Sequence, residues 1–143
     1  AVGENNFNPD SYHGNHTKQH ATWSPYDNNG GTVMAVAGEG YVICAADTRM
    51  STGYSIMTRQ YTKVDEMSPK TLMASAGFMA DAATLKKLLK GRCDQYQFAN
   101  NKPIGCVAFA QMLSNTLYMR RFFPYYAFNS FGTVIRFENF SNG

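Results

Sequence analysis

The sequence has little charge and no long apolar run, and each shortage excludes a class of partner. Charged residues make up 16% of the chain, and the formal net charge of +3 is too small to indicate binding to nucleic acid. No apolar stretch approaches the length of a membrane span, so no membrane partner is expected. The N-terminal residues also lack the charged-then-apolar pattern of a signal peptide, which predicts residence in the cytoplasm and nucleus.

Cysteine is scarce, and no metal-binding pattern is present. The three cysteines, at 44, 93 and 106, are odd in number and lie in apolar surroundings. This arrangement predicts buried thiols in a reducing compartment rather than disulfides. His13, His16 and His20 are spaced for one helix face, but their local sequence is a poor helix former and no carboxylate or cysteine completes a site. We therefore expect no metal and no other cofactor.

Apolar and aromatic residues, in contrast, are plentiful. Hydrophobic residues make up 44% of the 143 residues and aromatic residues 14%, enough for one domain with a buried core. A chain this rich in apolar surface and this poor in charge has more adhesive surface than it can cover alone. The composition therefore favours a subunit of a larger assembly.

The order along the chain predicts a polar extension followed by a folded domain. Residues 1–28 have no hydrophobic period and are expected to be extended or disordered, whereas residues 29–143 are expected to form the domain. Two almost continuously apolar runs, 33–37 and 41–46, flank Gly38-Glu39-Gly40, which is typical of a hairpin. Because both runs are apolar throughout, both faces of this hairpin are expected to be covered, one by helices and one by a second sheet.

After an irregular excursion over 48–60, a second strand pair is expected at about 61–66 and 71–76, with a turn around Ser68-Pro69. A helix is then predicted from near Met79, because apolar residues recur at intervals of three and four. The predicted apolar stripe consists of Ala82, Leu85, Leu88, Leu89, Cys93 and Tyr96, opposite a solvated face with Lys86, Lys87 and Lys90.

The loop at 100–103 ends this helix, and Pro103 is expected in the first turn of the next one. Two helices joined by so short a loop are expected to pack antiparallel across the sheet. The expected buried stripe of the second helix consists of Cys106, Ala110, Leu113 and Leu117, and this helix should end near Arg120-Arg121.

Several short motifs, in order over roughly residues 22–131, carry a resemblance to a known family. They are Trp23-Ser24-Pro25-Tyr26, Asn29-Gly30-Gly31-Thr32, Ala45-Ala46-Asp47-Thr48-Arg49, Gly53-Tyr54-Ser55-Ile56, Ser75-Ala76-Gly77-Phe78 and Arg120-Arg121-Phe122-Phe123-Pro124-Tyr125-Tyr126. Together they resemble eukaryotic 20S proteasome beta subunits, most closely a non-catalytic member of the kind found at the sixth position of the beta ring.

The resemblance implies an α+β fold, the four-layer αββα sandwich of N-terminal nucleophile hydrolases. It also implies a place among other beta and alpha subunits in stacked seven-membered rings that enclose a proteolytic chamber. In active members an N-terminal threonine is both base and nucleophile. Asp47 and Lys63 match the residues that tune this threonine, Arg49 matches a neighbouring arginine, and Gly77 matches the glycine whose N–H helps to stabilise the oxyanion.

The resemblance places Gly31 at the nucleophile position, so no residue of this chain is expected to be catalytic. Asp47 lies 15 and Lys63 31 positions after Thr32, each one short of the spacing in active members. Side chains on a strand alternate between faces, so this slip turns the Thr32 hydroxyl away from Asp47 and Lys63. The retained Asp47–Lys63 pair is then expected to serve folding, because removing either partner strands the other charge.

The end of the sequence departs from the family. Members continue well beyond the position of Phe131, whereas this chain gives one strand-like run at 133–137 and then an unfamiliar ending. Part of the C-terminal half is therefore expected to be missing. Three functions follow as hypotheses: a non-catalytic structural subunit of the proteasome core, an active threonine endopeptidase that uses Thr32, and a truncated interaction or assembly module.

Overall fold

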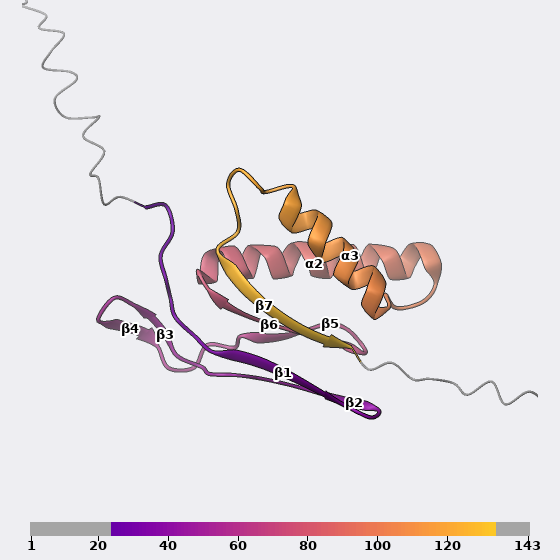
Figure 1. Ribbon diagram of the computed structural model, residues 1–143, viewed down its shortest axis with the longest axis horizontal. Helices are drawn as coiled ribbons and strands as arrows, with labels where there is room; N and C mark the ends of the chain where they lie inside the picture. Colours follow the sequence, from indigo (N-terminus) through magenta and orange to yellow (C-terminus); the bar gives the residue numbers. More distant parts are fainter. Residues whose placement is uncertain (1–23, 134–143) are drawn as a thin grey trace, which may run out of the picture.

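A β-hairpin begins the folded part of the computed structural model, which describes residues 24–133 (Figure 1). Strands β1 (Val33–Gly38) and β2 (Tyr41–Ala46) pair antiparallel, with Val33 opposite Ala46. Gly40 has φ +79° in the turn, a backbone conformation that residues with a Cβ rarely adopt. The structure thus confirms the hairpin that the glycines predict.

A second, smaller hairpin follows, formed by β3 (Met50–Thr52) and β4 (Ser55–Thr58). The expectation of an irregular excursion over 48–60 is therefore wrong. Strands of three and four residues are too short to show an alternating pattern in the sequence. Gly53 is the residue that marks this turn in the sequence, and in the structure it has φ +56°.

The central sheet has three antiparallel strands in the order β5–β6–β7. Strands β5 (Val64–Ser68) and β6 (Thr71–Gly77) confirm the second predicted pair. Strand β7 (Ala127–Thr133) was not predicted, because polar residues interrupt its apolar pattern. One of these, Asn129, has its Oδ1 2.8 Å from the Ser75 Oγ of β6, so its polarity is satisfied across the strands. The strand expected at 133–137 lies, apart from Thr133, outside the described residues.

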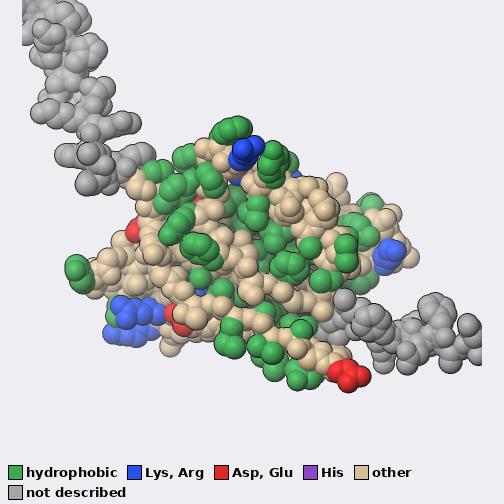
Figure 2. Space-filling view, viewed as in Figure 1, with side chains coloured by type: hydrophobic (Ala, Val, Ile, Leu, Met, Phe, Trp, Pro, Cys, Tyr) green, Lys and Arg blue, Asp and Glu red, His purple; other side chains and the backbone are tan. Residues whose placement is uncertain are grey.

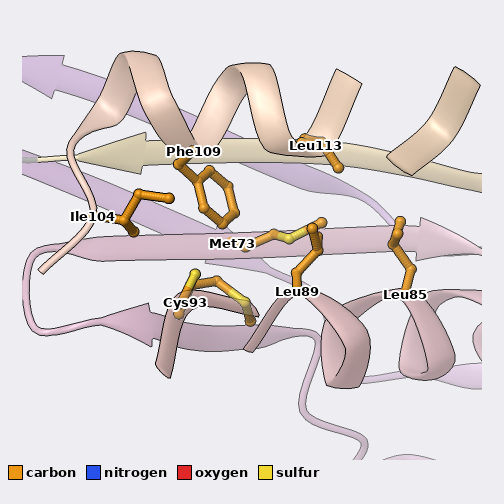
Figure 3. Close-up of a cluster of buried hydrophobic side chains, with 8 residues drawn as sticks. Met73, Leu85, Leu89, Cys93, Ile104, Phe109 and Leu113 are labelled. Carbon is orange, nitrogen blue, oxygen red and sulfur yellow. The ribbon is translucent and has the colours of Figure 1, made fainter. Parts of the chain in front are cut away.

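Two helices cover one face of this sheet: α2 (Met79–Asn100) begins where predicted, and α3 (Cys106–Tyr118) returns across it in roughly the opposite direction (Figure 1). Pro103 lies before α3 rather than in its first turn, and the expected end near Arg120-Arg121 is two residues too late. The predicted faces also need correction: Lys86 is buried and Leu88 is exposed. Four members of the expected buried stripes are only half-buried, namely Tyr96, Cys106, Ala110 and Leu117. The core side chains around Met73 of β6 are Leu85, Leu89, Cys93, Ile104, Phe109 and Leu113 (Figure 3).

The β1–β2 hairpin packs against the other face of the central sheet (Figure 1). The Val42 side chain of β2 fills the space over Gly132 of β7, where a Cβ would lie 2.2 Å from the Val42 Cγ1. The described residues therefore form three layers: helices, central sheet and hairpin. The prediction of a mixed α+β fold is confirmed.

The outer face of the hairpin is apolar and exposed in the described part of the chain. The large side chains on it, between 50% and 58% exposed, are Met34, Val36, Tyr41 and Ile43. The expectation that both faces of this hairpin are covered is therefore wrong for residues 24–133. A continuously apolar strand predicts that a cover is needed, but it does not identify the cover.

Candidate functional site

The candidate site lies at one end of the strands, where four segments meet. Gly31 precedes β1, Asp47 follows β2, Lys63 precedes β5 and Gly77 ends β6. Backbone hydrogen bonds hold these ends together: the Asp47 amide donates to the Thr32 carbonyl over 3.2 Å. The structure thus brings these four positions, which the resemblance singles out and which are far apart in the sequence, into one place.

Asp47 and Lys63 form an ion pair at the centre of the site. The Lys63 Nζ lies 2.7 Å from the Asp47 Oδ1 and 2.6 Å from the Arg49 carbonyl oxygen. Its side chain is completely buried, whereas that of Asp47 is 40% exposed. The hydrogen bond from Lys63, followed by the one from the Thr32 amide, lowers the pKa of the Asp47 carboxyl below its usual range.

Arg49 contributes to this site through its backbone. Its carbonyl accepts the hydrogen bond from Lys63, and its amide donates to the Asp47 Oδ2 over 3.2 Å. The carbonyl of Lys63 is itself held, because it accepts from the buried Lys86 Nζ over 2.6 Å. The same ammonium group pairs with the Asp65 carboxylate at 2.5 Å, so Lys86 supports the site instead of facing solvent.

The ammonium group of Lys63 faces the Cα of Gly31. A Cβ built on Gly31 would lie 2.7 Å from the Lys63 Nζ and 3.3 Å from the Ala76 Cβ. Gly31 also has φ +109°, in the left-handed region that favours glycine. A side chain at position 31 would point directly at Lys63, and there is no room for one without displacing that amine.

Gly77 contacts the segment before Gly31 through both of its backbone polar groups. Its amide donates to the Gly30 carbonyl over 3.2 Å, and its carbonyl accepts from the Asn29 amide over 3.0 Å. Its φ of +110° and a Cβ position only 2.9 Å from the Tyr126 carbonyl oxygen both require glycine here. The amide that resembles an oxyanion donor is thus engaged by the chain's own backbone.

Thr32 contacts the ion pair through its backbone. Its amide donates to the Asp47 Oδ1 over 2.7 Å. Within residues 24–133, no hydrogen bond joins the Thr32 hydroxyl to Asp47 or Lys63. A pocket of about 400 Å³ opens beside it, lined by Asn28, Gly30, Gly31, Thr32, Val33, Ala76, Gly77 and Phe128.

Asn29 is a key residue of this region that sequence reasoning missed. It is buried, and its Oδ1 accepts from the Met79 amide at the start of α2 over 2.8 Å. Its Nδ2 donates to the Ser51 carbonyl and to the Thr52 hydroxyl over 3.2 and 3.3 Å. One side chain therefore caps α2 and anchors β3 just ahead of Gly31. Only its position within the Asn-Gly-Gly-Thr motif could have drawn attention to it.

Neither a metal site nor a membrane-spanning helix occurs within the described range. No three histidine, cysteine or acidic residues cluster there, and neither helix is apolar enough over sufficient length to cross a bilayer. The three histidines considered as ligands lie outside that range. Burial raises the pKa of the Cys44 and Cys93 thiols, although Cys44 is only half-buried.

Comparison with known proteins agrees with this arrangement. The family model described as "Proteasome subunit" matches residues 27–138. Proteasome subunit beta type-1 of Arabidopsis thaliana is 59% identical over 116 residues, which are 81% of this chain and 52% of that protein. The same-named protein of Petunia hybrida has the same identity and coverage.

A more distant relative covers more of the chain. Proteasome subunit beta type-1 of Danio rerio is 46% identical over 132 residues, which are 92% of this chain and 55% of that protein. The chain thus spans about half the length of the curated relatives that it matches. Together with the motifs around Gly31, Asp47 and Lys63, these matches show that the chain belongs to the proteasome subunit family and is similar to its beta type-1 members.

Proposed function

We propose that the chain acts as a non-catalytic beta subunit of the 20S proteasome core particle, in which it helps to close the beta ring and to form the wall of the proteolytic chamber. The observation that carries this proposal is the position of the Lys63 ammonium group, 2.7 Å from where a Cβ of residue 31 would lie. The ammonium group lies where it would meet a side chain at position 31, and that position has none.

Chemistry at this site would need a nucleophile within reach of Lys63. Position 31 is the place for it, since a Cβ there would be 2.7 Å from the ammonium nitrogen. Thr32 is one residue further along, and it offers Asp47 a backbone amide instead of a hydroxyl. Without a nucleophile, the Asp47–Lys63 pair has a structural role: it joins the segments that follow β2 and precede β5.

Assembly with other proteasome beta and alpha subunits follows from family membership and from the exposed apolar surface. The outer face of β1–β2 carries large apolar side chains at least 50% exposed, which is unfavourable in water. In the proposed complete fold, a second helical layer covers this face and produces the four-layer αββα sandwich. The sequence that the longer relatives have beyond this chain would supply it. The proposal places the protein in the cytoplasm and nucleus.

Native purification of the protein from the cells that make it, followed by mass spectrometry of the whole complex, tests this function. We expect the chain to migrate with a particle of proteasome size, together with other beta and alpha subunits. Migration apart from such a particle would contradict the proposal and favour an interaction or assembly module. The same spectra give the chain's N-terminus, and a chain that begins at Thr32 would favour an active endopeptidase.

A further inference from the structure

The connection between α3 and β7 presents an arginine–aromatic surface, which we define as Tyr118, Met119, Arg120, Arg121, Phe122 and Phe123. Its apolar members are unusually exposed: Phe122 is 95% exposed, and the other three are 59% to 71% exposed. Figure 2 shows positively charged side chains bordered by hydrophobic ones at the top of the molecule, over this connection. A patch of large apolar groups around two positive charges is more typical of an interaction site than of a solvated loop.

The fold holds this surface in place from beneath. The Tyr26 hydroxyl donates to the Pro124 carbonyl over 2.7 Å, and its ring stacks on Phe123 with centroids 5.6 Å apart. The Asp81 carboxylate at the start of α2 accepts from the Tyr126 amide over 2.9 Å. The connection is therefore tied to both the N-terminal segment and α2, which lowers the entropy lost on binding.

Aromatic rings order the two guanidinium groups, and no carboxylate within residues 24–133 pairs with them. The Arg120 Cζ lies 5.4 Å from the Tyr125 ring centroid, and the Arg121 Cζ lies 5.8 Å from Tyr118 and 5.7 Å from Phe122. The ion pairs of residues 24–133 are those of Lys63 and Lys86, so neither arginine has an acidic partner there. A stacked guanidinium keeps most of its N–H donors free for a carboxylate.

We propose that this arginine–aromatic surface docks an acidic segment of a neighbouring protein subunit, with a carboxylate on Arg121 and an adjacent apolar side chain against Phe122. Charge complementarity identifies the occupant: two ordered guanidinium groups, without counter-charges in the described part of the chain, match carboxylates in geometry and sign. The exposed rings supply the apolar contact that gives such an interface its affinity. This inference rests on the proposed function, because the neighbour is another subunit of the assembled particle.

Site-specific photocrosslinking in the assembled particle tests this inference. The crosslinking amino acid p-benzoylphenylalanine replaces Phe122, and in a control it replaces Phe98, which is 93% exposed near the end of α2. We expect position 122 to crosslink to one segment of another subunit that contains aspartate or glutamate. Crosslinks to a segment without acidic residues, to nucleic acid or within the same chain would overturn the inference.

Charge variants then test the role of Arg121. We expect Arg121→Glu to lower the crosslink yield about tenfold, as loss of a charge-assisted pair implies, and Arg121→Lys to lower it less. Replacing the captured acidic residue by arginine should restore the yield with Arg121→Glu, even where that variant alone assembles poorly. An unchanged yield in Arg121→Glu, or no rescue, would refute the inference. Incorporation of the unsubstituted chain into particles, measured in parallel, separates this failure from failure of the proposed function.

Discussion

Replacing Lys63 by methionine removes the ammonium group from the candidate site and keeps most of the buried aliphatic stem. The variant leaves the Arg49 carbonyl without its donor and the Asp47 carboxylate without its counter-charge. Because the proposed role of this pair is structural, we expect the free energy of unfolding to fall. No peptidase activity of this chain is expected to be lost.

The structure sets the size of the effect. Removing one partner of a fully buried ion pair costs about 3–5 kcal/mol. The Lys63 side chain is 0% exposed, but that of Asp47 is 40% exposed and stays partly hydrated when it is left alone. The expected loss is therefore about 2–3 kcal/mol, after this reduction for solvent screening.

Urea unfolding of the purified chain, followed by circular dichroism, measures this loss. With a slope of about 1–3 kcal/mol per molar urea, the midpoint should fall by about 0.7–3 M. Lys87→Met is the matched control, because Lys87 is exposed on α2 and its replacement should change stability by less than about 0.5 kcal/mol. Equal midpoints for Lys63→Met and Lys87→Met would refute the structural role of the pair.

Three further predictions concern the same region, each measured by urea titration. The pKa of Asp47 is lowered in the folded chain, so its carboxylate stabilises the fold above the unfolded pKa of about 3.9, and this stabilisation is lost as the pH falls through the folded pKa. The difference in free energy of unfolding between the unsubstituted chain and Asp47→Asn should therefore shrink below about pH 4. A difference that is constant down to about pH 2 would contradict this. Gly31→Ala should lower the free energy of unfolding by about 1–3 kcal/mol through backbone strain. Its control, Gly91→Ala in an open helical position, should leave that free energy unchanged or raise it. The reverse order of the two variants would be inconsistent with the site geometry. Asn29→Ala should lower the free energy of unfolding by about 2–4 kcal/mol, because the Met79 amide at the start of α2 loses its acceptor and the Ser51 carbonyl loses a donor. Asp27→Ala is the control, since Asp27 is exposed. Similar urea midpoints for the two variants would count against the cap.

Local signals in the sequence predicted the main elements of the fold. The glycines at 38 and 40 locate the first hairpin, and the interval of three and four from Met79 locates α2. The prediction that Lys86 faces solvent is wrong, because helical periodicity gives only the angle of a side chain around the helix axis. Its burial depends on Asp65, which lies on a separate strand, and no local pattern announces such a partner.

The candidate site shows the same limit. Motif order was enough to expect Asp47, Lys63 and Gly77 in one place, and the structure brings them together around Gly31. The cap that Asn29 provides to Met79 could not be predicted, because 50 residues separate donor and acceptor. The engagement of the Gly77 amide by Gly30 is likewise a consequence of tertiary structure.

We propose that this chain retains a protease framework without a nucleophile. The most direct test treats the purified particle with a covalent probe for N-terminal threonines and then measures the intact mass of each subunit. We expect this chain to be unlabelled and still to carry residues ahead of Thr32, including Gly31. A labelled chain that begins at Thr32 would contradict it.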